Sequence, residues 1–192
     1  MKTIYSIIIK IYLVWSRIYR YFERSMPYYN NFKNEFNKKI PLVSSESMWR
    51  ILVELIHYEK DKIYHLWDVT SDPFFILKRG WGDCDDYSAI AYYMLGTTIE
   101  YRNKIYKYIG TFYLIYKTGG HVIFLWKREL DGTCLMISTK KLSIQKNIKA
   151  AFSNFENKKA IAHVMADNEK GFFDVKYKTI YMPEDFERMG DL

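Results

Sequence analysis

The sequence has little cysteine, glycine or proline. Its two cysteines, Cys84 and Cys134, are too few for a disulfide-dense secreted scaffold or for a zinc site built from cysteine alone. Nine glycines and four prolines exclude collagen-like and linker-like sequence. No stretch of about 18 uncharged residues is present, so no membrane-spanning helix is predicted. No small-residue cleavage site follows the apolar N-terminal residues, so no secretory signal is predicted either.

The chain nevertheless has ample material for a core, with 49% hydrophobic and 27% charged residues. Its net charge of +7 is unevenly spread. Residues 1–40 hold eight basic and two acidic side chains, which leaves the other 152 residues nearly balanced at +1. We therefore predict a basic N-terminal arm and linker over residues 1–40 and one folded domain over residues 41–192.

The apolar residues of the arm recur at alternating steps of four and three, which is typical of a helix that buries one side. Lys10, Arg17 and Arg24 recur every seven residues on another face, and Met26-Pro27 ends the predicted helix. Ile7, Val14 and Tyr21 widen the apolar side. The predicted partner-binding stripe consists of Ile4, Ile8, Ile11, Trp15, Ile18 and Phe22.

Four surfaces can receive this stripe. The first expectation is that the arm covers its own domain, and the second is a neighbouring protein subunit or another copy of the chain. A membrane surface comes third, since aromatic and basic residues suit that interface. Nucleic acid comes last, because no glycine-rich, zinc or helix-turn-helix signature accompanies the charge.

The rest of the chain reads as helices followed by strands. This order predicts an α+β domain with a mainly antiparallel sheet. Helices are predicted over 44–67, 74–78, 83–95 and 143–156, and strands over 108–117, 121–128, 134–138, 160–166 and 172–182.

Cys84 is predicted to lie in the first turn of the helix over 83–95. Unpaired backbone N–H groups at a helix start favour a thiolate, whereas Asp83, Asp85 and Asp86 disfavour a second negative charge. His121, which follows two glycines at the start of a strand, is the candidate cationic partner. Alternatively, Cys84 is simply a small buried residue. His57, His65 and His163 are interpreted as structural.

The segments DPFFILKRGWGDCDDYSAIAYYML and GGHVIFLW resemble the transglutaminase-like cysteine peptidase superfamily, which has a papain-like fold. The resemblance covers about residues 72–140. It implies that Cys84 is the nucleophile and His121 the general base in acyl transfer from amides. It also implies a substrate cleft near Trp81, Gly82 and Asp86, with no cofactor.

The family's third catalytic member, an aspartate on the next strand, is missing. Similarity places Ser138 there, while a two-residue turn at Asp131-Gly132 would place Leu142 opposite His121. Residues 134–143 contain no Asp, Glu, Asn or Gln. Loss of such a carboxylate lowers turnover about 10⁴-fold in the serine-protease template, although cysteine depends less on this help.

Two hypotheses follow. The first is a small cysteine peptidase or amidase that acts on a protein or peptide through a Cys84–His121 dyad. The second is a catalytically degenerate structural or interaction subunit of a larger assembly, such as a bacteriophage virion. The expected location is the cytoplasm of a bacterial or phage-infected cell, with the virion as the alternative. No metal site is expected, since the acidic residues around Cys84 lack the glycine and glutamate of a calcium loop.

Overall fold

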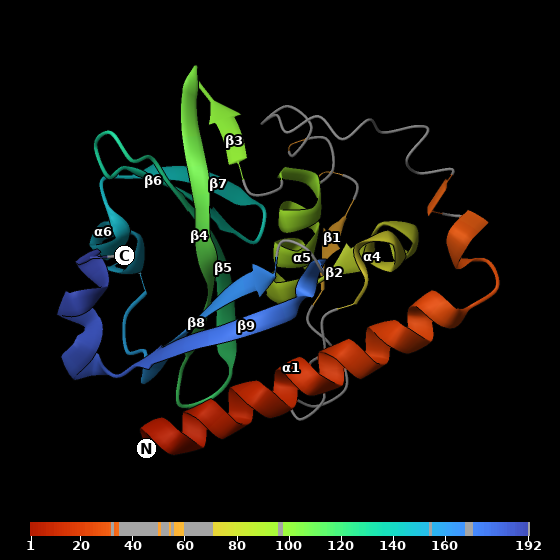
Figure 1. Ribbon diagram of the computed structural model, residues 1–192, viewed down its shortest axis with the longest axis horizontal. Coiled ribbons are helices and arrows are strands. Elements are labelled where there is room, and N and C mark those ends of the chain that lie inside the picture. The colour runs from red at the N-terminus through yellow and green to blue at the C-terminus, as the bar shows by residue number, and fades with distance from the viewer. Residues whose placement is uncertain are drawn as a thin grey trace.

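The computed structural model describes residues 1–31, 33–34, 50, 54, 56–59, 71–95, 98–153, 155–167 and 171–191. It is a mixed helix and sheet protein built on one seven-stranded sheet in which every pairing is antiparallel (Figure 1). The strand order is β7-β6-β5-β4-β8-β9, with β3 paired to β4. The strands are β3 (Thr98–Tyr101), β4 (Lys104–Ile115), β5 (Gly120–Lys127), β6 (Cys134–Ser138), β7 (Lys141–Gln145), β8 (Ala160–Asp167) and β9 (Gly171–Tyr181).

Helices cover both faces of the sheet. On one face, α5 (Cys84–Leu95) packs against Phe124 and Trp126 of β5. On the other face, α6 (Ile148–Ser153) and the 3₁₀ helix η1 (Pro183–Asp191) pack against Ile123 and Leu125 of the same strand. Successive side chains of a strand point to opposite faces. In β5 the even-numbered side chains therefore face α5, and the odd-numbered ones face α6 and η1.

A short helix, α4 (Pro73–Arg79), leads into the segment that carries Cys84. The Asp72 side chain caps it by accepting a hydrogen bond from the Phe74 N–H, and Pro73 occupies the first turn. Gly80 ends it in the left-handed conformation, with φ of 75°. Next comes the strand β2 (Trp81–Gly82), which pairs in parallel with β1 (His57–Tyr58).

Helix α1 (Lys2–Ser25) forms as predicted, but it does not bury the predicted stripe. It crosses the α5 face of the sheet at β8 and β9 and continues toward α4 (Figure 1). The side chains that it places against the sheet are Tyr5, Ile9 and Leu13, which lie on the opposite side of the helix. The arm therefore does cover its own domain, but the expectation that the predicted stripe makes this contact is wrong.

Two further expectations about secondary structure are wrong. The predicted helix over 143–156 is divided into β7 and α6, because residues 141–145 pair with β6 and the Asn147 side chain caps α6 at the Ala150 N–H. The predicted helix over 44–67 lies mostly outside the described residues, and His57–Tyr58 within it form β1. Among the helices that the structure describes, none combines the length and apolarity needed to cross a membrane.

Candidate functional site: the start of α5 and the underside of α1

Cys84 is the first residue of α5 and is buried, with 8% of its surface exposed. The Ser88 hydroxyl donates a hydrogen bond to its carbonyl oxygen over 2.8 Å. Its neighbours are acidic: the thiol and one carboxylate oxygen each of Asp83 and Asp85 lie within 4.8 Å of one another. One sulfur and two oxygens are a possible set of cation ligands among the described residues, but Asp85 is already held by a tyrosine of α1.

That tyrosine is Tyr12, whose hydroxyl donates to Asp85 Oδ2 over 2.6 Å. The Tyr12 ring also makes an edge contact with Tyr113 of β4 at 5.3 Å between ring centroids. Helix α1 thus contacts the first turn of α5, directly beside Cys84. Among the described residues, the groups near the thiol include the carboxylates of Asp83 and Asp85.

The three predicted cleft residues, Trp81, Gly82 and Asp86, do lie together, and they make packing and polar contacts within the domain. Asp86 is 2% exposed, forms an ion pair with Arg79 and accepts a hydrogen bond from the Ser71 N–H over 3.0 Å. Trp81 stacks under the Arg79 guanidinium at 4.0 Å. A Cβ on Gly82 would come within 2.8 Å of the Asp86 side chain, so glycine is needed for this close approach. These contacts join α4 to α5.

His121 and Ser138 meet, as the sequence predicts: Nε2 of His121 lies 2.8 Å from Ser138 Oγ. The imidazole also contacts Phe155 at 5.4 Å between ring centroids, and burial lowers its pKa below the usual value. The turn between β5 and β6 is wider than two residues. Cys134 pairs with Lys127, and Ser138 pairs with Ile123, so Leu142 lies on β7 opposite Ile137 and not beside His121.

The structure does not bring Cys84 and His121 together. His121 lies on the same face of the sheet as Ile123 and Leu125, because it is two and four residues from them along β5. Its ring contacts Phe155, which packs in the cluster formed with α6. Cys84 begins α5, which covers the other face (Figure 1). The β5 residue on the α5 face at this end of the strand is Val122, which pairs with Tyr113. The sheet itself separates the predicted nucleophile from the predicted base.

A polar interface under the second half of α1 was missed by the sequence reasoning. Arg24 Nε donates to Asp72 Oδ2 over 2.8 Å, and the Asp72 N–H donates to Glu23 Oε2 over 2.7 Å. Glu23 and Arg20 are only 4% and 3% exposed. Burial raises the pKa of Glu23 to about 7 and lowers that of Arg20 to about 9.

A signal for this interface was present in the sequence. Tyr5, Ile9, Ser16, Arg20 and Glu23 also follow steps of three, four and seven, on the side opposite the apolar stripe. Apolar periodicity alone does not reveal such a face, because most of these residues are polar.

The stripe itself points away from the domain. Its six predicted members are 40–61% exposed: Ile18 40%, Trp15 44%, Ile8 50%, Ile11 53%, Ile4 59% and Phe22 61%. The residues that widen it are exposed as well, at 51% for Ile7, 54% for Val14 and 73% for Tyr21.

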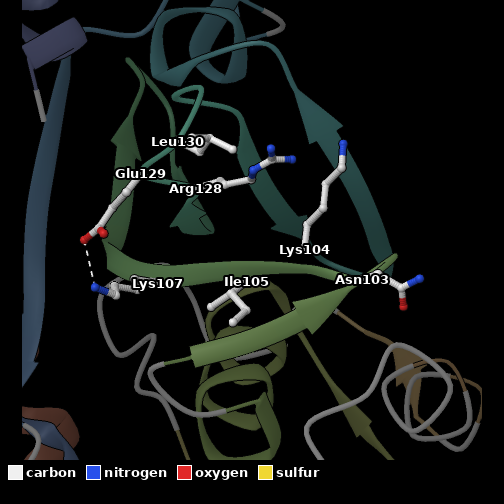
Figure 2. A pocket seen from close by; sticks show the side chains of 7 residues that line it. All are labelled: Asn103, Lys104, Ile105, Lys107, Arg128, Glu129 and Leu130. Carbon is white, nitrogen blue, oxygen red and sulfur yellow. Dashed lines mark hydrogen bonds and ion pairs between the residues drawn. The ribbon is translucent and has the colours of Figure 1, made fainter.

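A cavity of about 480 Å³ lies elsewhere, at the tip of the β3–β4 hairpin beside the β5–β6 turn (Figure 2). Lys107 and Glu129 form an ion pair across it at 2.8 Å. Arg128 is paired with Asp131 at 3.5 Å. None of the predicted site residues lines this cavity, whose walls are Asn103, Lys104, Ile105, Lys107, Arg128, Glu129 and Leu130.

Comparison with known proteins does not assign the chain to a family. No protein-family model, no curated protein and no solved structure matches it. The resemblance to the transglutaminase-like superfamily therefore depends on the two sequence segments around Cys84 and His121 alone.

Proposed function

We propose that this protein is a non-catalytic interaction module, in which the α+β domain holds α1 and presents its outer face to a partner. The observation that carries the proposal is the placement of Cys84 and His121 on opposite faces of the sheet. A general base acts only within hydrogen-bond reach of the group it deprotonates, directly or through one water. Side chains packed on both faces of the sheet lie between the two groups, and this supports the proposal.

The contacts of Cys84 support the same conclusion. Tyr12 of α1 bonds to Asp85, the residue next to the thiol, and Glu23 and Arg24 of the same helix bond to Asp72 at the start of α4. The segment that carries the catalytic cysteine in the family is thus the segment to which α1 binds in this protein. We propose that the module derives from a transglutaminase-like core whose thiol-bearing helix has kept its place on an antiparallel sheet.

The pH dependence of Cys84 alkylation tests the proposal. Iodoacetamide labelling of the full chain is followed by peptide mapping from pH 5.5 to 9, in the native protein and in His121→Ala. Cys134 is the internal control, because it is fully buried and burial raises its pKa to about 11, so its labelling reports unfolding. We expect slow labelling of Cys84 that His121→Ala leaves unchanged.

Fast labelling of Cys84 below about pH 7, which a thiol of ordinary acidity does not show, would overturn the proposal if His121→Ala abolished it. That result would establish a working cysteine–histidine pair and would favour the peptidase or amidase hypothesis. A His121→Phe variant keeps the ring contact with Phe155 and therefore separates loss of the base from loss of packing.

A further inference from the structure

Helix α1 is mounted with its apolar side outward. In an ordinary surface helix the apolar face is buried on the domain and the polar face meets water. Here Tyr12, Glu23 and Arg24 bond to the domain, while the isoleucine stripe defined above is exposed. Burial of apolar side chains is favourable, so this orientation leaves an apolar surface whose burial would stabilise contact with a partner.

The exposed surface is broad. Its apolar residues extend from Tyr21 on one side of the helix, through Ile18, to Tyr19 on the other, and all three are at least 40% exposed. Contiguous apolar patches on monomeric proteins rarely exceed about 300–600 Å². Trp15 and Phe22, at 44% and 61% exposure, already contribute on the order of 200 Å², given about 200 Å² for each aromatic side chain.

The charge on α1 favours an anionic surface. Lys10 and Arg17 are exposed on the flank of the stripe, whereas Lys2 and Arg24 of the same helix are paired with Asp185 and Asp72. The only acidic residue between positions 1 and 25 is Glu23, which faces the domain and is 4% exposed. The outward part of the helix therefore carries positive charge and no negative charge.

A second copy of the chain fits less well. Two-stranded helical pairs use a narrow seam flanked by opposite charges. The positions that flank the stripe here are Tyr5, Tyr12, Tyr19, Ile7, Val14 and Tyr21.

We propose that the outer face of α1 binds an anionic lipid bilayer, with the helix lying in the plane of the interface between the membrane and the domain. Isoleucine, tryptophan and phenylalanine side chains enter the boundary between headgroups and acyl chains, and Lys10 and Arg17 contact the headgroups. A basic side chain near such a surface strengthens binding by about fivefold. This inference names the partner of the interaction module and therefore rests on the proposed function.

Vesicle sedimentation with the full chain tests the inference. The protein is mixed with vesicles of phosphatidylcholine alone or with about 30% phosphatidylserine, a composition that models an anionic leaflet. We expect strong binding to the anionic vesicles, weakened by salt. The double variant Ile11→Glu, Ile18→Glu should bind at least about tenfold more weakly, because each added charge must be buried in the interface.

Two variants serve as controls. Ile105→Glu changes an isoleucine of β4 that is 62% exposed and distant from α1 in sequence, and it should bind like the native protein. Lys10→Glu, Arg17→Glu should remove the preference for phosphatidylserine. Because all four α1 positions are exposed, circular dichroism and urea unfolding should show these variants to be folded.

Three outcomes overturn the inference: no binding of the native protein to either vesicle, equal binding by Ile11→Glu, Ile18→Glu, or a dimer in sedimentation equilibrium that this variant dissociates. The third would identify a second copy as the occupant and would leave the interaction module standing. Conversely, a working Cys84–His121 pair in the alkylation experiment would refute the proposed function and leave vesicle binding to be judged by its own result.

Discussion

The hydroxyl of Tyr12 donates a 2.6 Å hydrogen bond to Asp85, the residue that follows the candidate nucleophile. The two residues are 73 positions apart in the chain. From the sequence, the N-terminal arm is expected to be separate from the domain, and the segment around Cys84 is expected to be catalytic. This bond joins the arm to that segment. Asp85 is 3% exposed, so its carboxylate depends on this partner for part of its solvation.

Tyr12→Phe should therefore destabilise the protein by about 1–3 kcal/mol, because a buried carboxylate loses a donor. It should also speed the alkylation of Cys84, since α1 is held less firmly at the start of α5. Urea unfolding and peptide mapping measure the two effects. Tyr21→Phe, at a tyrosine of α1 that is 73% exposed, is the control and should change neither. Equal stabilities for the two variants would contradict the role assigned to this bond.

Glu23 should give the protein a characteristic pH dependence. Its pKa rises from 4.5 to about 7 on folding, so the folded state holds the proton more tightly than the unfolded state. The associated stability is present below about pH 4.5 and is lost as pH rises through 7, an effect on the order of 3 kcal/mol. Unfolding midpoints measured between pH 5 and 8 should fall more steeply in the native protein than in Glu23→Gln. Parallel profiles for the two proteins would refute this assignment.

His121 should act in the opposite direction. Burial lowers its pKa, so the stability it contributes is present above about pH 6.5 and is lost as pH falls below that value. A nuclear magnetic resonance titration should place the midpoint of His121 below 6.5, with the signal assigned by its absence in His121→Phe. The same variant should be less sensitive to mild acid than the native protein. A midpoint above 6.5 would indicate an anionic partner, such as a thiolate, beside the ring.

Gly110 should be intolerant of any side chain. It lies at the bulge of β4 with φ of 149°, and an added Cβ would clash with Nε2 of His163. That nitrogen lies 2.7 Å from the Ile109 carbonyl oxygen, and the ring stacks on Phe112. Gly110→Ala should cost about 2–4 kcal/mol in urea unfolding.

The control for this change is Gly120→Ala, where the nearest atom to an added Cβ is 3.4 Å away. It should cost much less than Gly110→Ala. Similar losses at the two positions would show that His163 and the bulge yield easily, against the role that the structure gives them.

Several elements follow from local sequence alone. The strands over 121–128 and 134–138, the helix that begins near Cys84, and the end of α1 before Pro27 are placed within about two residues of the structure. These segments have strong local signals, namely apolar runs, flanking glycines and a proline. The β3–β4 hairpin lacks such a signal: its turn is Arg102-Asn103, both with positive φ, and arginine is an unusual residue there.

Local sequence signals do not reveal on which face of the sheet His121 lies. Residues 122–126 of β5 are all buried, so the strand is apolar on both sides and shows no alternation. A shift of one position would move His121 to the face of Cys84. The resemblance around the two residues gives their order along the chain, and only the pairing of β5 with β4 and β6 decides on which face each side chain lies.

The sequence by itself determined the amphipathic helix, its basic charge, the helix start at Cys84 and the antiparallel strands, because these depend on residues close together in the chain. The tertiary structure decided which side of α1 meets the domain and which face of the sheet carries His121. Both decisions depend on contacts between distant residues, such as Tyr12 with Asp85 and Arg24 with Asp72. Buried polar groups must find partners, and in this fold those partners for α1 lie at the starts of α4 and α5, which turns its apolar side outward.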